Sequence, residues 1–360
     1  MLGEAKAYVI TLGANMDSDS LILAIDGGGS ASRTALYKED GTLVSETIIG
    51  PLSCKSSGCD AVAASLTELR GFLGSDSLLI RAAVFGLSGL DSPEDFATMG
   101  NLLIEAGICD HDMVPKKFSY GYRCESAWNF PILLCSDALL PLFGNGFTEG
   151  TVVISGTGSV ALRIGPRGKV ERFGGRGYMT SDEGSGCWIG CEFMREALHV
   201  ADEVLSGHTS PSKLQASSNT LLEEAFLATR KQWESRVPTK STIERKARFL
   251  REWATAHDDP KAYASLARSV MESKATACRS IRQRASQHLA WLANISCVKE
   301  APVVVFSGGI FLNAGFADQT AKTTIESSKV KGIRALASKA HPTIGAFALA
   351  QHVWPEEQPR

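Results

Sequence analysis

The sequence has no long apolar run and no strong excess of one charge. No stretch of its 360 residues approaches the roughly 18 consecutive apolar residues that a membrane-spanning helix needs. Its 37 basic and 39 acidic side chains leave a net charge of −2, which argues against a nucleic-acid binder that relies on a positive field. The first twenty residues carry three acids and one lysine, unlike a secretory signal or a transit peptide. We therefore expect an N-terminal tail over residues 1–20, and neither a membrane nor a nucleic acid as partner.

The nine cysteines are odd in number and scattered, and no pair has the Cys-x2-Cys spacing of zinc ribbons and thioredoxin-type sites. Isolated cysteines are common as small buried apolar residues of reduced proteins. This pattern predicts a reduced chain located in the cytoplasm. Cys187 and Cys191 lie four residues apart, but a metal or redox pair would need further ligands that the neighbouring sequence lacks. We expect both to be buried apolar side chains.

The order of the predicted elements indicates a duplicated α/β fold. Short apolar runs of strand length alternate with helical patterns, which is typical of an α/β protein. A strand, a small-residue turn and a hairpin occupy residues 21–49, and the same series recurs at 151–173, about 130 residues later. We expect an N-terminal domain over residues 21–147, completed by a helix at 341–354, and a C-terminal domain over residues 148–340.

The chain after residue 186 is predicted to be mainly helical. The Ser- and Gly-rich stretch from Leu205 to Asn219 predicts a loop. Asp259 followed by Pro260 is typical of an N-cap and the first position of a helix. The apolar rhythm of that helix continues to Leu289, with arginine and lysine on its other faces, which predicts a solvated charged surface.

Three of the predicted strands are followed by turns rich in glycine, serine and threonine, at residues 27–30, 156–159 and 307–310. Glycine lets successive amides point into one concavity, and hydroxyl side chains add donors, so such turns bind phosphate oxygens. Any tight turn favours glycine, so one such turn would be weak evidence. The prediction of phosphate binding rests on the presence of three such turns. No Gly-Lys-Ser/Thr follows these turns, which argues against a P-loop NTPase. None of them fits Gly-x-Gly-x-x-Gly, which argues against a Rossmann dinucleotide site.

These turns, with Ser136-Asp137-Ala138 and the run from Gly174 to Ile189, resemble the N-acetylglucosamine kinase branch of the BadF/BadG/BcrA/BcrD ATPase family. This family lies within the actin-like, Hsp70 and sugar-kinase superfamily. The most specific part is Asp182-Glu183-Gly184-Ser185 before a helix, because the glycine turns are shared across the superfamily. The resemblance implies two duplicated RNase-H-like (actin-like ATPase) domains that close over ATP in an interdomain cleft, with the last helix packed on the first domain.

The resemblance also implies an activity. It points to a kinase that uses ATP and Mg²⁺ to phosphorylate the 6-hydroxyl of an amino sugar, most simply N-acetylglucosamine, with glucosamine and N-acetylmuramic acid as alternatives. Members of the family are often dimers, so a homodimer is one option. An ATPase activator of the BadF type stays open as an alternative, although no obvious pair of cysteines matches its iron–sulfur cluster. A sugar-responsive regulator also stays open, but the leader of about 20 residues is too short for a DNA-binding helix-turn-helix segment.

The resemblance assigns the nucleotide site to the three turns. Asp26 stands where the family places a carboxylate that organises Mg²⁺, often through water. The first turn would hold the β- and γ-phosphates, the second would form the opposite side of the phosphate site, and the third would line the nucleoside pocket. The expected ATP-binding residues are Gly27, Gly28, Gly29, Ser30, Gly156, Thr157, Gly158, Ser159, Gly308, Gly309 and Asn313.

Asp137 ends the strand predicted at residues 132–136 and is the candidate catalytic base. Phosphoryl transfer to an alcohol needs a group that accepts the hydroxyl proton and lies near the acceptor. Aspartate at this position could instead cap the helix that follows, which is a common role for this residue. The resemblance favours the base and implies that Asp137 also contacts the substrate.

The resemblance assigns further substrate contacts. Asp182 would hydrogen-bond sugar hydroxyls, with Gly175 and Gly177 letting the ring approach the backbone. The other interpretation is that Asp182 caps the helix that begins after Gly184, and the two roles are compatible. Ser88 falls at another sugar contact of the family, and could equally be a turn residue.

Two positions depart from the family pattern. The family usually has asparagine shortly after the stretch that corresponds to residues 50–53, and here Cys54 or Lys55 occupies that place; cysteine is a poor donor and acceptor for a sugar. The kinases of N-acetylglucosamine typically have tryptophan where Arg176 stands. A guanidinium suits an anionic substituent through bidentate pairing. An acidic or unacetylated amino sugar is one hypothesis, a surface arginine is the other, and N-acetylglucosamine remains the leading substrate.

Overall fold

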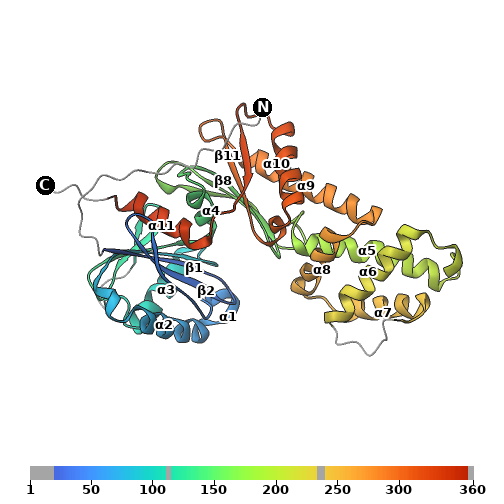
Figure 1. Ribbon diagram of the computed structural model, residues 1–360, viewed down its shortest axis with the longest axis horizontal. Helices are drawn as coiled ribbons and strands as arrows, with labels where there is room; N and C mark the ends of the chain where they lie inside the picture. Colours follow the sequence, from blue (N-terminus) through green and yellow to red (C-terminus); the bar gives the residue numbers. More distant parts are fainter. Residues whose placement is uncertain (1–19, 111–114, 233–239, 356–360) are drawn as a thin grey trace. The chain divides into compact units, whose positions relative to one another are not determined.

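The computed structural model describes residues 20–110, 115–232 and 240–355. The chain divides into two compact units. Unit 1 combines Met1–Gly144 with Ala340–Arg360, and unit 2 is Asn145–Lys339. Each unit is built on its own β-sheet, with helices packed against it (Figure 1). The prediction of an α/β protein is confirmed.

The sheet of unit 1 has seven strands in the order β3-β2-β1-β4-β7-β6-β5. The strands β1, β4 and β7 are parallel, and the remaining pairings are antiparallel. Parallel strands end at the same edge of a sheet, so the residues that follow β1, β4 and β7 gather there. The strands are β1 Leu21–Gly27, β2 Ser32–Lys38, β3 Leu43–Ile49, β4 Ile80–Leu87, β5 Lys116–Phe118, β6 Gly121–Glu125 and β7 Pro131–Ser136.

Both faces of the central strand β1 are buried. Leu21, Leu23 and Ile25 belong to a core cluster with apolar side chains of α2 and α3, while Ile22 and Ala24 are buried on the opposite face. The last helix, α11, packs against β1 and β4 (Figure 1). A strand covered on both faces reads as a continuous apolar run, as the sequence LILAI does. The helices are α1 Cys54–Ser57, α2 Cys59–Leu73, α3 Pro93–Glu105, α4 Leu140–Gly144 and α11 Pro342–Val353, with 3-10 turns at Gly74–Leu78 and Asp137–Leu139.

The sheet of unit 2 repeats the order of the first five strands of unit 1. Its five strands lie in the order β10-β9-β8-β11-β12, with an antiparallel hairpin on one side and the parallel strands β8, β11 and β12 on the other. This repetition agrees with the predicted duplication. The strands are β8 Gly150–Ser155, β9 Ser159–Ile164, β10 Val170–Gly174, β11 Val303–Ser307 and β12 Arg334–Ala337.

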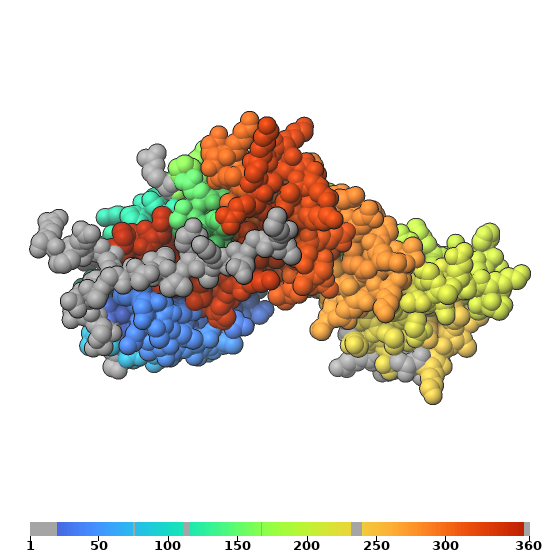
Figure 2. Space-filling model, turned by 45° about the horizontal axis from the view of Figure 1, so that its top comes forward, coloured from blue at the N-terminus to red at the C-terminus, as the bar shows by residue number. Residues whose placement is uncertain are grey.

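Most helices of unit 2 share one large core with one face of its sheet. Phe193, Phe226 and Trp253 are fully buried in that core, which α5, α6 and α7 share with α8 and α9. Figure 2 shows the yellow-green and orange segments of this unit as one continuous mass. The helices are α5 Gly186–Leu205, α6 Ala216–Gln232, α7 Ile243–Ala256, α8 Pro260–Glu272, α9 Thr276–Ser296 and α10 Ala314–Ser327, with 3-10 turns at Pro166–Gly168, Pro211–Lys213 and Gly309–Leu312.

Two helix predictions were wrong in detail. The loop expected up to Asn219 ends earlier, because α6 already begins at Ala216. The helix that begins at Pro260 does not continue to Leu289, but breaks into α8 and α9. At the break, the Ser273 hydroxyl accepts the Ala275 amide at 3.0 Å, a local side-chain bond that competes with the helical pattern. In the described parts of the chain, no helix is both long and apolar enough to cross a membrane.

Candidate functional site

The first glycine turn, residues 27–30, offers two amides and a hydroxyl. Gly27 still pairs within the sheet, opposite Ser32. The Gly28 amide donates to the Ala31 carbonyl oxygen at 3.1 Å, so it is used inside the turn. Within the described residues, the amides of Gly29 and Ser30 donate to no protein group. These two amides and the exposed Ser30 hydroxyl are the donors that this turn presents to a ligand.

Asp26 and Asp137 stand at the same edge of the unit 1 sheet. Asp26 lies near the end of β1, opposite Gly86 of β4, and Asp137 directly follows β7, whose last residue Ser136 lies opposite Leu87 of β4. The two carboxylates therefore flank the end of β4. Both are half-buried.

The environment of Asp137 favours its protonated form. Burial raises the pKa of Asp137 to about 7, and the negative charge of Asp26 acts in the same direction. The N-cap of the following 3-10 turn is Ser136, whose hydroxyl accepts the Ala138 amide at 3.4 Å. The Asp137 carboxylate itself accepts the Ser136 hydroxyl at 3.5 Å, and this bond and one from the Ala138 backbone partly oppose the rise of the pKa of Asp137. An acid with a pKa near neutrality can accept and release a proton at working pH.

A polar network next to Asp26 was not foreseen from the sequence. Burial raises the pKa of Asp26, while the charges of Arg33 and His341 oppose the shift. His341 Nε2 lies 3.4 Å from a carboxylate oxygen of Glu46, and His341 Nδ1 lies 2.9 Å from the Thr343 hydroxyl. His341 immediately precedes α11, and its spacing in the sequence carries no signal for this role, since Asp26 lies more than 300 residues earlier.

The donor set around Asp26 fits a magnesium ion bound largely by water. Mg²⁺ is usually held by one or two carboxylates together with substrate phosphates, and keeps several waters. Asp26 is a partly desolvated carboxylate beside a turn with free amides, and Asp137 lies at the same sheet edge. Among the described residues, no group of three or more His, Cys, Asp or Glu side chains could hold a metal by itself. The arrangement therefore suits a metal that arrives with a phosphate ligand rather than a permanent protein-only site.

The second glycine turn, residues 156–159, displays two adjacent amides on one side. The carbonyl oxygens of Gly156 and Thr157 accept the amides of Gly186 and Cys187, at 2.7 and 3.1 Å, at the start of α5. In a trans peptide the next N–H points opposite to the carbonyl. The amides of Thr157 and Gly158 therefore point away from α5, and neither donates to a protein group in the described chain. Two such amides form an anion-binding nest.

A cavity of about 720 Å³ lies beside this turn in unit 2, within the roughly 300–1,000 Å³ range of small-molecule sites. It brings together Gly156, Thr157, Gly309 and Asn313, which the sequence analysis assigned to the nucleotide. Gly308 stands next to Gly309 with φ 104°, and a Cβ there would lie 2.4 Å from the Ser155 carbonyl oxygen, so only glycine fits.

One wall of this cavity comes from α8, which the sequence analysis missed. Residues of α8 that line it are Lys261, Ala264, Ser265, Ala267, Arg268, Met271 and Glu272. The amphipathic pattern of α8 reveals that it is a helix, but not that one of its faces borders a glycine turn. Asn313 lines the cavity and also caps α10, where its side chain accepts the Phe316 amide at 3.0 Å.

A second cavity of unit 2, of about 560 Å³, borders the loop after β10. Its lining includes Ser159, Arg176 and Asp182 from the predicted set, together with His288 and Trp291 of α9. The Trp291 ring is 61% exposed, so an aromatic surface is available in the same cavity as Arg176. This contribution could not be foreseen from the sequence, because α9 follows the loop by about 100 residues.

Asp182 is held tightly against the second glycine turn. It is 8% exposed and has φ 70°. Burial raises the pKa of Asp182, and backbone groups of Gly177 and Ser159 oppose this shift. A Cβ at Gly158 would lie 2.6 Å from Asp182 Oδ2. The N-cap of α5 is Ser185, whose hydroxyl accepts the Trp188 amide at 3.2 Å, so the capping role considered for Asp182 belongs to Ser185.

The remaining predicted positions of unit 1 lie near the first turn. The Ser88 amide donates to the Gly27 carbonyl oxygen at 2.8 Å, so Ser88 lies beside the first turn. Lys55 Nζ pairs with Asp91 at 3.1 Å and with Asp95 at 2.7 Å. Burial raises the pKa of Cys54 to about 12, which keeps it a thiol. Neither Cys54 nor Lys55 offers a sugar both a hydrogen-bond donor and an acceptor, as an asparagine side chain would.

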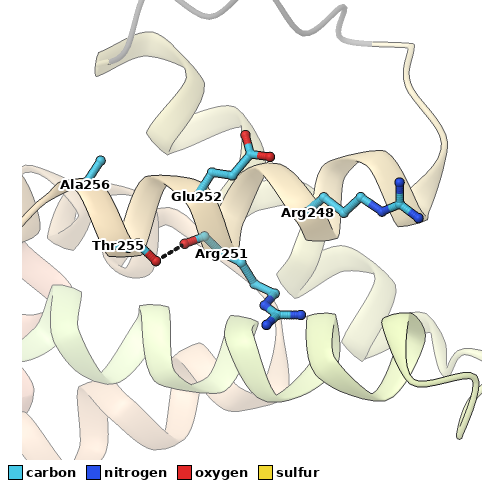
Figure 3. A pocket seen from close by; sticks show the side chains of 5 residues that line it. All are labelled: Arg248, Arg251, Glu252, Thr255 and Ala256. Atoms are coloured by element: carbon cyan, nitrogen blue, oxygen red, sulfur yellow. Dashed lines mark hydrogen bonds between the residues drawn. The ribbon is translucent and has the colours of Figure 1, made fainter.

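A further depression, of about 500 Å³, lies on α7 and involves none of the predicted residues (Figure 3). All five residues that line it belong to this one helix, and the Thr255 hydroxyl donates to the Arg251 carbonyl oxygen at 2.9 Å.

The two cysteines at the start of α5 lie close together. Cys187 Sγ and Cys191 Sγ are 4.0 Å apart, with Cys187 buried and Cys191 half-buried. Burial raises the pKa of Cys187 to about 12, which suits an inert thiol.

Comparisons with known proteins place these features in a family. The model of the BadF/BadG/BcrA/BcrD ATPase family matches residues 23–350. An N-acetylmuramic acid/N-acetylglucosamine kinase of Clostridium acetobutylicum is 33% identical over 187 residues, which are 51% of this chain and 55% of that relative. A glucosamine kinase of Vibrio cholerae is 29% identical over 189 residues, which are 52% and 57% of the two chains. The chain thus matches these curated relatives over about half of their length.

A solved structure shares the fold. The crystal structure of a candidate N-acetylglucosamine kinase from Chromobacterium violaceum is 21% identical, covers 93% of this chain and 100% of its own, and has a TM-score of 0.60. At this identity the likeness establishes the two-sheet α/β architecture, while the activity has to be argued from the residues.

Proposed function

Because the chain belongs to the BadF/BadG/BcrA/BcrD ATPase family, we propose that it is a kinase that transfers the γ-phosphoryl group of ATP to the 6-hydroxyl of an amino sugar. The observation that carries this proposal is Asp137, a half-buried carboxylate at a strand end, with a pKa raised to about 7 by burial and by Asp26. N-acetylglucosamine is the first substrate to test. Glucosamine and N-acetylmuramic acid follow, and all three sugars occur in the names of the relatives.

Asp137 acts as the base in this proposal. Its carboxylate accepts the proton of the sugar hydroxyl while the hydroxyl oxygen bonds to the γ-phosphorus, and the bond from that phosphorus to the β–γ bridging oxygen breaks. A base of this kind is most effective when its pKa lies close to the working pH. The raised pKa of Asp137 meets that condition, whereas an ordinary exposed aspartate would be too weak a base.

Each of the two glycine turns presents phosphate-binding donors in this proposal. The Gly29 and Ser30 amides of unit 1 and the Thr157 and Gly158 amides of unit 2 are donors without protein partners in the described chain. Oriented amides stabilise negative charge without having to reorganise during the reaction. Asp26 would hold Mg²⁺, which neutralises phosphate charge when it is bound.

The cavity between the second turn and α8 suits the nucleoside. It is lined by the small residues Gly156 and Gly309 at one side and by Ala264, Ala267 and Met271 of α8 at the other. Lys261, Arg268 and Glu272 of α8 add charged groups to this lining. Apolar walls with a small number of polar groups are typical of small-molecule sites. Asn313 supplies a polar group at the rim.

The acceptor contacts are proposed for Ser88 in unit 1 and for the loop that contains Gly175, Arg176 and Gly177 in unit 2. Arg176 is exposed and lines the cavity that Trp291 also lines. An aromatic ring can pack against the apolar face of a sugar, while a guanidinium can pair with a carboxylate or donate hydrogen bonds to hydroxyl oxygens. This combination supports an amino sugar, with room for an acidic substituent.

A coupled assay of ADP release tests the proposed function. The panel comprises N-acetylglucosamine, glucosamine, N-acetylmuramic acid, N-acetylmannosamine, glucose and an anhydro-sugar, each with ATP and Mg²⁺. The proposal expects sugar-dependent ADP release with at least one amino sugar, together with a product in which the 6-oxygen carries phosphate, identified by NMR. ADP release that is the same with and without every sugar would contradict the proposal and favour the ATPase activator.

A further inference from the structure

The segment that follows the loop containing Gly175, Arg176 and Gly177 forms several hydrogen bonds with the second glycine turn. The Ser155 hydroxyl donates to the Gly184 carbonyl oxygen at 3.0 Å, and the Ser159 hydroxyl donates to the Glu183 carbonyl oxygen at 3.1 Å. The amides of Gly186 and Cys187 bond back to the turn, as described above. Residues 182–187 therefore form hydrogen bonds with the serines on either side of the turn, Ser155 and Ser159, and with the carbonyl oxygens of Gly156 and Thr157 inside it. We call this segment the bracket.

Asp182 begins the bracket, and its side chain is packed against the tip of the turn. Asp182 Oδ2 occupies the space where a Cβ of residue 158 would lie, at 2.6 Å. All three protein atoms nearest to that Cβ position belong to the Asp182 carboxyl group. Gly158 contributes one of the two amides that the turn displays. The position of the Asp182 side chain and the position of the Gly158 amide are thus coupled through direct contact.

Asp182 lines the cavity of about 560 Å³, but the burial of its Oδ1 atom argues against a sugar contact at that oxygen. Its Oδ1 atom is buried and has no hydrogen-bond partner in the described chain, and the residue as a whole is 8% exposed. A sugar hydroxyl could reach this oxygen only if the loop moved. Leaving a buried polar atom without a partner and holding a non-glycine residue at φ 70° both cost free energy. Such costs are concentrated at functional sites, where the surrounding structure enforces the conformation.

Resting on the proposed function, we propose that Asp182 is a positioning residue that sets the Gly158 amide for the phosphates, rather than a contact of the sugar. Removing its side chain frees the tip of the turn, so the loss falls on nucleotide binding and on turnover. Its charge is not needed for this role, because the contact with Gly158 is one of shape. Asparagine has nearly the same shape and tolerates a positive φ, so it preserves the contact.

Two variants separate positioning from sugar binding. Asp182→Gly removes the side chain and is compatible with φ 70°, and Asp182→Asn keeps its shape. We expect Asp182→Gly to raise the calorimetric Kd for the non-hydrolysable analogue β,γ-imido-ATP by about tenfold and to lower kcat by about 10²-fold, because small misplacements of a binding group are costly. We expect its KM for the sugar to change by less than about twofold. Asp182→Asn should retain the wild-type Kd for the analogue.

A double-mutant cycle tests the contact itself. Gly158→Ala places a methyl group against Asp182 Oδ2, so alone it should weaken binding of β,γ-imido-ATP. In the Asp182→Gly background that space is open, so Gly158→Ala should weaken binding of β,γ-imido-ATP clearly less than it does in the wild type. Residues in contact show such non-additivity, whereas independent residues do not. Asp202→Asn is the matched control, since Asp202 lies on the exposed side of α5 and pairs only loosely with Arg251, at 3.5 Å.

The outcomes are distinct. A sugar KM raised by both Asp182 variants, with the Kd for the analogue unchanged, overturns the inference and restores Asp182 as a sugar contact. Equal costs of Gly158→Ala in both backgrounds also overturn it. A wild-type chain that phosphorylates no sugar on the panel defeats the proposed function alone, because the Kd for β,γ-imido-ATP still reports on the turn. Thermal unfolding of each variant verifies that it is folded before these comparisons are made.

Discussion

Asp26 and Asp137 flank the end of β4, and the negative charge of Asp26 helps to raise the pKa of Asp137 to about 7. The larger cause is the burial of Asp137 itself. In the proposed reaction the two acids have different tasks, one beside the phosphates and the metal and the other next to the acceptor hydroxyl.

Substitution of the base should stop turnover without preventing nucleotide binding. Asp137→Asn removes the proton acceptor but keeps the size of the side chain, so kcat should fall by about 10²–10⁴-fold. The Kd for β,γ-imido-ATP should stay within about threefold of the wild type, because the turns are unaltered. Stopped assays of sugar phosphate and calorimetry measure the two quantities. Near-normal turnover would remove Asp137 from the catalytic role.

The rate should depend on pH through the ionisation of Asp137. The base works only as a carboxylate, so kcat/KM should rise with pH and level off above about 7. Replacing Asp26 by asparagine removes a like charge and should lower the pKa of Asp137. Because Asp26→Asn also affects the metal, the shift is best followed by carboxyl ¹³C NMR titration rather than by rate. A pKa of Asp137 that does not move in this variant would contradict the pairing.

The same pKa shift predicts how stability varies with pH. The ordinary pKa of the Asp137 carboxyl is 3.8, and folding raises it to about 7. Between these values the folded state binds the proton more tightly than the unfolded chain does, so the free energy of unfolding falls as pH rises through this window. Asp137→Asn has no carboxyl group at this position, so its free energy of unfolding lacks this pH dependence. The wild type should therefore lose stability relative to Asp137→Asn between about pH 4 and pH 7, as measured by urea unfolding, and a constant difference would speak against the shift.

Arg176 should influence which sugar is preferred. Arg176→Trp removes a cation and adds an aromatic ring in the cavity that already contains Trp291. We expect kcat/KM for N-acetylmuramic acid to fall about tenfold relative to N-acetylglucosamine, because a charged pairing partner of the carboxylate is lost. Arg248→Trp on the exposed side of α7 serves as the control. An unchanged ratio would make Arg176 a surface residue without a part in specificity.

The packing of α11 against α4 within unit 1 should depend on Gly345. A Cβ at this position would lie 2.1 Å from the Leu140 carbonyl oxygen of α4, and backbone atoms cannot yield as a side chain does. Gly345→Ala should lower the free energy of unfolding by about 1–3 kcal/mol or more. Gly71→Ala is the matched control: Gly71 lies within α2, and no atom lies within 4 Å of its Cβ position. That substitution should be neutral or stabilise by about 0.4–1 kcal/mol, and equal losses in both variants would contradict the packing argument.

Much of the candidate site could be predicted from the sequence because its elements are local. The buried strand LILAI ends in a run of glycines, and that order alone predicts β1 and a turn. The same holds for the second turn after β8, and for Asp137 at the end of β7. The capping alternatives were decided only by the structure. Ser136 and Ser185 take the capping roles considered for Asp137 and Asp182, and which of two neighbouring polar residues caps a helix depends on backbone angles that composition does not reveal.

By itself the sequence determined the elements, the repeated order of strand, turn and hairpin, and the family, because strand periodicity and the conformational freedom of glycine act over a few neighbouring residues. Only the tertiary structure decided which distant groups meet. It brought His341 to Asp26, α8 to the second glycine turn, and the Asp182 carboxyl group to Gly158. Such contacts follow from how sheets and helices pack, and a distance across a packed interface is a property of the whole core rather than of any local segment.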